Sequence, residues 1–157
     1  MLAHPLLAAE AGRGPGTMPM HGRTFIDTNV LVYAFDSSEP TKQQTAIHAL
    51  AQTGDRSVLS TQVLSEFYVV ATRKLAEPLA PHIAADVIAQ LSRLPVVDTD
   101  TALVRSAIDI SVHSQVSYWD GLIVAAAAAS GCDRILTEDL ASGATINGVE
   151  IVDPFAA

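Results

Sequence analysis

The sequence is poor in cysteine and in long apolar runs, and each shortage excludes a class of protein. Its single cysteine, Cys132, rules out an intramolecular disulfide and a zinc site built from cysteines. The longest unbroken apolar run, Leu122 to Ala129, is far shorter than the roughly 20 residues that span a bilayer. We therefore expect no membrane segment and, because a lone thiol suits a reducing compartment, a cytoplasmic protein.

Basic residues are also few. Nine Lys and Arg stand against 17 Asp and Glu, which gives a net charge of −8. Proteins that bind nucleic acid without sequence preference usually present a basic face to the phosphates. Composition alone therefore argues against a nucleic-acid partner, unless the acidic residues gather around cations.

What is present is enough for one folded domain. The 157 residues, 49% hydrophobic and 17% charged, fit a single domain with a substantial core. Residues 1–23 are rich in Gly and Pro without periodicity, which predicts a flexible N-terminal leader, and Met18 or Met20 is a possible alternative start. The leader has no basic residue before its short apolar patch, and Glu10 interrupts that patch, so we do not expect a signal peptide. The folded domain is expected at residues 24–157.

Short apolar runs alternate with amphipathic segments through this domain. The former predict strands at residues 24–26, 57–59, 95–97, 134–136 and 150–152. The latter predict helices at residues 40–53, 61–75, 81–94, 100–113 and 117–130. Strands that alternate with helices indicate an α/β domain with a mainly parallel central sheet and helices on both faces.

Two acidic residues follow predicted strands. In such sheets ligands bind beyond the carboxyl ends of the strands. Asp27 directly follows the first strand, and Asp139 lies three residues after Leu136. Each also has a purely structural interpretation: Asp27 as a helix cap and Asp139 as a turn residue.

Two further acids lie in predicted helices. Glu66 falls at the edge of an apolar stripe, where it either faces a partner in the domain or extends outward to pair with Arg73. Asp120 opens the most apolar helix, which should be the central buried one. With Ser117 it matches a capping box, although the positive end of a buried helix would equally favour a carboxylate aimed at a cation.

The four acids together suggest a metal site. Carboxylates that meet in one pocket cannot all ionise without protons or cations to balance them. All-oxygen ligation favours Mg²⁺ or Mn²⁺ over zinc. His48, His82 and His113 fall on separate predicted helices and form no competing cluster.

Five segments in this order resemble the PIN-domain nucleases, specifically the VapC-type toxins of type II toxin–antitoxin modules. They are FIDTNVLVYAF, LSEFYVV, SYWDGLIVAAA, ILTEDL and INGVEIVDPF, and they extend over about Thr24 to Phe155. The chain departs from the family pattern in its longer leader and at Gly121, where Ala is often found.

The resemblance implies an endoribonuclease that uses Mg²⁺, or Mn²⁺ as a substitute, to hydrolyse RNA. It implies catalytic and metal-binding roles for Asp27, Glu66, Asp120 and Asp139, with polar support from Asn29, Ser117 and Thr137. A cognate antitoxin and homodimerisation are further implications. Contacts to the substrate would come from a few basic residues at the rim, for which the candidates, each equally interpretable as a solvated surface charge, are Lys42, Arg73, Lys74 and Arg105.

Other classes fit less well. Phosphatases of the haloacid-dehalogenase type and phosphoacceptor receiver domains also place an Asp after a strand, but both need a Lys late in the chain. Here the only lysines are Lys42 and Lys74, and Asn29 replaces the second Asp of the phosphatase motif. A non-catalytic PIN-like binding module, whose acidic cup is a structural cation site or a partner site, remains open as the alternative.

Overall fold

The computed structural model of the protein describes residues 22–156, so the predicted leader lies almost entirely outside the described residues. The first strand begins at Thr24, where the sequence predicts it. The elements in chain order are β1 (Thr24–Ile26), α1 (Thr28–Tyr33), α2 (Pro40–Thr53), the 3-10 helix η2 (Gly54–Arg56), β2 (Ser57–Ser60), α3 (Thr61–Arg73), α4 (Pro81–Leu91), β3 (Val96–Val97), α5 (Thr101–Ser114), α6 (Tyr118–Ala129), β4 (Arg134–Leu136), β5 (Thr145–Ile146) and β6 (Val149–Val152).

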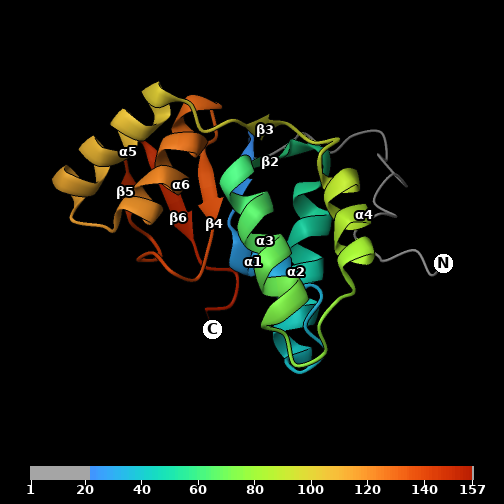
Figure 1. Cartoon of the computed structure of the whole chain (residues 1–157). Helices are drawn as coiled ribbons and strands as arrows, with labels where there is room; N and C mark the ends of the chain where they lie inside the picture. The colour runs from blue at the N-terminus through green and yellow to red at the C-terminus, as the bar shows by residue number, and fades with distance from the viewer. Residues whose placement is uncertain (1–21, 157) are drawn as a thin grey trace, which may run out of the picture.

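The strands form one six-stranded sheet in the order β3-β2-β1-β4-β6-β5. All neighbouring strands are parallel except β5, which runs antiparallel to β6. Figure 1 shows α5 and α6 together beside β5 and β6, and α2, α3 and α4 grouped at the other side of the molecule. The α/β prediction with a mainly parallel sheet is confirmed.

Strands β1 and β2 are buried along their whole length, as expected for a parallel sheet covered by helices. Phe25 of β1, Leu59 of β2 and Ile135 of β4 have no exposed surface, and Phe67 of α3 packs against this core with none either. This rigid centre fixes the strand ends from which the acidic residues project.

Helix α6 is the central buried helix that its composition predicts, since residues 121–127 are all buried. It packs closely against α5. A methyl group on Gly121 would lie 2.6 Å from the carbonyl oxygen of Ala107 and 3.3 Å from the backbone nitrogen of Ser111. The departure from the family pattern at Gly121 therefore has a structural reason, because only a hydrogen fits between the two helices.

Strand β5 is missing from the sequence-based prediction. It is joined to β6 by Asn147 and Gly148, whose φ angles are +49° and +80°. Positive φ at both central residues is the signature of a type I′ hairpin, for which Asn-Gly is the favoured pair. The turn was thus readable from the sequence, although a strand of two residues is too short to show alternation.

Within residues 22–156, no helix has the combination of length and hydropathy that a membrane crossing requires.

Candidate active site

Asp27 stands where β1 ends and α1 begins. Its backbone nitrogen donates to the carbonyl oxygen of Leu136 at 3.0 Å, which continues the pairing of β1 with β4. One carboxylate oxygen, Oδ1, accepts from the backbone nitrogen of Thr28 at 2.7 Å, so Asp27 does cap α1. The other, Oδ2, accepts from the hydroxyl of Thr137 at 2.7 Å. The structural interpretation of Asp27 is confirmed, and it leaves the residue at the carboxyl edge of the sheet.

The register of the sheet explains why residues so far apart in sequence meet. Ile26 of β1 is paired with Leu136 of β4, so the residues that follow them, Asp27 and Thr137, leave the sheet side by side. Thr137 is completely buried. A buried hydroxyl between two strand ends is a fixed hydrogen-bond donor for the Asp27 carboxylate.

Asp27 is only 5% exposed, and this burial raises the pKa of its carboxyl group to about 6. Hydrogen bonds from Thr137 and Thr28 oppose the rise, while the negative charges of Asp139 and Glu66 add to it. Within residues 22–156, no lysine or arginine forms an ion pair with any of the four predicted acids. A buried carboxylate without a cation is a charge that the fold leaves uncompensated.

Glu66 is directed toward Asp27 by its helix. Ser60 caps α3 by accepting from the backbone nitrogen of Val63 at 3.2 Å, and Glu66 follows one turn later. Its Oε2 accepts from the Thr28 hydroxyl at 2.8 Å and its Oε1 from the Gln62 amide at 2.9 Å. The pairing with Arg73 that the sequence left open is not formed. Glu66 instead faces the start of α1, beside Asp27.

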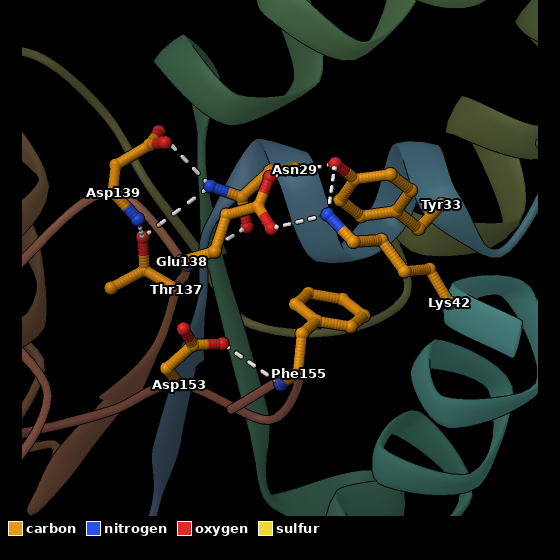
Figure 2. Close-up of polar contacts among 8 residues, drawn as sticks. All are labelled: Asn29, Tyr33, Lys42, Thr137, Glu138, Asp139, Asp153 and Phe155. Carbon is orange, nitrogen blue, oxygen red and sulfur yellow. Dashed lines mark hydrogen bonds and ion pairs between the residues drawn. The ribbon is translucent and has the colours of Figure 1, made fainter. Parts of the chain in front are cut away.

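Asp139 is joined to the same place through Asn29. The amide nitrogen of Asn29 donates to Oδ2 of Asp139 at 3.0 Å and lies 3.4 Å from the Thr137 hydroxyl oxygen (Figure 2). The backbone nitrogen of Asp139 donates to that same hydroxyl oxygen at 3.1 Å. The predicted supporting residues Asn29 and Thr137 therefore stand between Asp27 and Asp139.

Asp120 lies in the first turn of α6. Ser117 caps α6 by accepting from the backbone nitrogen of Asp120 at 3.1 Å. Partial burial raises the pKa of Asp120, and the negative charges of Asp139 and Glu66 raise it further. Four acids from four separate segments of the chain thus share one electrostatic environment.

The donor chemistry of this cluster fits a hard divalent cation, because it consists of carboxylate oxygens with neutral amide and hydroxyl groups around them. The side chains are not gathered around one point, however. Within residues 22–156, no three His, Cys, Asp or Glu side chains are placed so that a single ion could contact them all. The carboxylates are instead held by Thr28, Asn29 and Thr137.

The four basic candidates are placed differently from the acids. The ammonium of Lys42 is 3.0 Å from both Oε2 of Glu138 and the hydroxyl of Tyr33, and it lies 4.5 Å from the centre of the Tyr33 ring (Figure 2). The hydrogen bonds with Tyr33 and Glu138 raise the pKa of Lys42. The remaining candidates are exposed, at the end of α3 and on α5: Arg73, Lys74 and Arg105.

An open cleft of about 500 Å³ adjoins Glu66, and nothing in the sequence pattern predicts it. Its walls are formed by seven residues of α3, α6 and the segment after β3: Thr61, Gln62, Ser65, Glu66, Thr99, Trp119 and Leu122. Thr28 and Gln62, which donate hydrogen bonds to Glu66, are also absent from the residues predicted from the sequence. Both have a sequence signal, since Thr28 directly follows Asp27 and Gln62 lies one helical turn before Glu66.

Solved structures with the same fold include toxin–antitoxin proteins. A toxin–antitoxin complex from Klebsiella pneumoniae contains a chain that is 19% identical, with a TM-score of 0.66 over 85% of this chain and 99% of that one. A DNA-bound VapBC from Salmonella typhimurium is 23% identical, with a TM-score of 0.62 over 85% and 98%. VapC20 from Mycobacterium tuberculosis, described as a toxin that cleaves the sarcin–ricin loop, is 20% identical, with a TM-score of 0.60 over 74% and 89%.

None of the curated proteins matches this chain in sequence. The family model described as the PIN domain matches residues 24–141, which is three quarters of the chain and contains all four acids. The chain belongs to the PIN-domain family.

Proposed function

We propose that the protein is a divalent-cation-dependent endoribonuclease that hydrolyses RNA phosphodiester bonds and acts as the toxin of a toxin–antitoxin pair. The observation that carries this proposal is that four acids from four separate segments lie near enough to repel one another, with no basic partner within residues 22–156. Such a cluster favours cations, and a cation site at a strand-end edge suits a phosphodiester substrate. Membership of the PIN family and the likeness to the sarcin–ricin-cleaving toxin support RNA as that substrate.

The proposed ligands of Mg²⁺, or of Mn²⁺ in its place, are Asp27, Glu66, Asp120 and Asp139. When bound, the cation supplies the positive charge and the Lewis acidity that the acidic cluster lacks. The chain's own neutral residues prepare the site. Thr137 and Thr28 fix the Asp27 carboxylate, Asn29 holds Asp139, and Ser117 fixes the first turn of α6 below Asp120.

Contacts to RNA phosphates are proposed for the exposed basic residues. Arg73 lies two turns along α3 from Glu66, about 10 Å on the same face of the helix. Lys74 follows it, and Arg105 is exposed on α5. Lys42 is a weaker candidate, because Glu138 and Tyr33 already hold its ammonium group.

The proposed protein partners are a cognate antitoxin and a second copy of this chain, in a cytoplasmic setting. Antitoxin binding is supported by the likeness to toxin–antitoxin complexes. Exposed apolar residues on α5, Ile108 and Val112, lie one helical turn apart and support self-association. The molar mass of the purified chain in solution, measured by light scattering, tests the dimer.

An RNA cleavage assay tests the enzymatic proposal. Purified protein with Mg²⁺ should cleave RNA, and a chelator should stop cleavage. The Asp27→Asn variant should lose activity by more than the roughly 10- to 100-fold that residues outside the first ligand shell cost. Asp86→Asn, which alters an exposed carboxylate on α4, is the matched control and should keep full activity. A non-catalytic binding module predicts the opposite: no cleavage above background by the wild-type protein.

A further inference from the structure

Trp119 stands unusually exposed beside the acidic cluster. It is 63% exposed, although it lies in the first turn of the most buried helix of the protein. Tyr118 contacts the Trp119 ring edge to face, with ring centres 5.1 Å apart and planes at 69°, which orients the indole. Trp119 also lines the 500 Å³ cleft that Glu66 borders. An oriented, exposed indole next to a proposed catalytic centre is a surface on which a flat ring can stack.

The cleft is neutral apart from Glu66. Its other lining residues are two threonines, a serine, a glutamine, a leucine and the tryptophan. With no basic side chain in its wall, the cleft offers nothing to a phosphate group. It is an open depression that suits an uncharged aromatic group carrying hydrogen-bond donors and acceptors.

Gln62 adds a specific polar feature to the wall. Its amide nitrogen is 2.9 Å from Oε1 of Glu66 and 3.4 Å from the backbone oxygen of Trp119, and it donates to both. These contacts fix the orientation of the amide and leave Oε1 of Gln62 buried without a hydrogen-bond partner. Buried acceptors are nearly always satisfied, so Gln62 brings to the edge of the cleft a fixed amide with an unsatisfied oxygen.

We infer that this cleft is a nucleobase subsite, in which one unstacked base of the RNA substrate lies against Trp119 while the adjacent phosphate faces the acidic cluster. The inference rests on the proposed function, because it takes RNA as the substrate. It also names the form of RNA recognised: a single-stranded or flipped-out nucleotide, since a base within a duplex has no free face to stack. Stacking further provides affinity that a protein of net charge −8 cannot obtain from phosphate contacts alone.

Trp119 is the only tryptophan in the sequence, so its fluorescence reports directly on the cleft. A chelator is added to prevent cleavage. Under this condition a short single-stranded oligoribonucleotide of mixed sequence should quench the Trp119 fluorescence in a saturable way. The same strand annealed to its complement should quench it much less. Absence of quenching by the single strand, or equal quenching by the duplex, would overturn the subsite.

Kinetics provide the second measurement. With Mg²⁺, Trp119→Ala should raise KM for a single-stranded substrate about tenfold and leave kcat nearly unchanged, because stacking of a base is commonly worth that much in affinity. Trp119→Phe should restore most of the affinity. Tyr68→Ala removes another exposed aromatic ring, on α3 but outside the cleft, and should have no effect.

The outcomes separate this inference from the proposed function. Cleavage with the same KM in Trp119→Ala would refute the subsite and leave the nuclease proposal standing. Quenching of Trp119 by the single strand but not by the duplex, without any cleavage of RNA, would refute the nuclease proposal and leave the subsite standing. Unchanged RNA affinity in Trp119→Ala together with a changed molar mass in solution would also refute the subsite, and would assign Trp119 to a contact between protein chains.

Discussion

Asp27 serves as both a helix cap and the most buried carboxylate of the acidic cluster. The sequence placed it correctly after β1 but could not rank these two roles, because both require the same position. In the structure one carboxylate oxygen caps α1 and the other accepts from the Thr137 hydroxyl, so the cap leaves the second oxygen at the sheet edge. For Glu66 the sequence left a surface pairing with Arg73 open, and only the packing of α3 against α1 shows that Thr28 takes its place.

The buried charge of Asp27 makes the metal-free protein less stable as the pH rises. Its pKa is about 6 in the folded chain against an ordinary value of 3.8, so the folded state binds more protons between these two values. Stability therefore falls as the pH rises from about 4 to about 7, by about 3 kcal/mol from this residue. In the presence of a chelator, the Asp27→Asn variant should not show this fall in the free energy of unfolding. It should therefore be more stable than the wild-type protein at pH 7, but not at pH 4.

Urea unfolding at the two pH values measures the difference. Asp86→Asn, at an exposed position on α4, should follow the wild-type protein at both. An equal difference between Asp27→Asn and wild type at pH 4 and pH 7 would contradict a raised pKa of Asp27.

The helices and strands were largely predictable, because buried parallel strands and amphipathic helices differ in period and length. The exceptions are local. The prediction for α4 ran to residue 94, but the helix ends at Leu91 and the chain turns through Ser92 and Arg93 before β3. Strand β5 was missed, although its Asn147–Gly148 turn carries a clear signal. The close contact of α5 with α6 could not be predicted, since a glycine in a helix does not reveal what it faces.

Gly121 tests that contact. Gly121→Ala would normally stabilise a helix by up to about 1 kcal/mol. Here the added methyl would meet the Ala107 carbonyl oxygen at 2.6 Å, and overpacking of this kind typically costs about 1–3 kcal/mol. The net result should be a lower free energy of unfolding, by about 1–2 kcal/mol.

Denaturant unfolding of Gly121→Ala measures this loss. Ala89→Gly, at an exposed position inside α4, makes the reverse exchange and provides the comparison, because it should also destabilise, through helix propensity alone. A Gly121→Ala protein more stable than wild type would show that α5 and α6 are not in close contact at this point.

For the molecule as a whole, the sequence predicts that four acids meet, because parallel strands deliver their carboxyl ends to one edge of the sheet. The register of β1 with β4 places Asp27 beside the segment that carries Asp139. The exact directions of the carboxylates could not be predicted, since each depends on a neutral neighbour from another element: Thr28, Asn29 or Thr137. The exposure of Trp119 and the cleft beside it also depend on the packing of α3 near α6.

Thermal unfolding in the presence of Mn²⁺ tests the convergence of the four acids most directly. A ligand that binds only the folded state at about 100 times its Kd stabilises by about 2.7 kcal/mol, which corresponds to roughly 5–10 °C for a domain of this size. At neutral pH, millimolar Mn²⁺ should raise Tm of the wild-type and Asp86→Asn proteins by that amount and leave Tm of Asp27→Asn nearly unchanged. An equal Tm with and without Mn²⁺ in the wild-type protein, or an equal rise in Asp27→Asn, would contradict a cation site formed by these carboxylates.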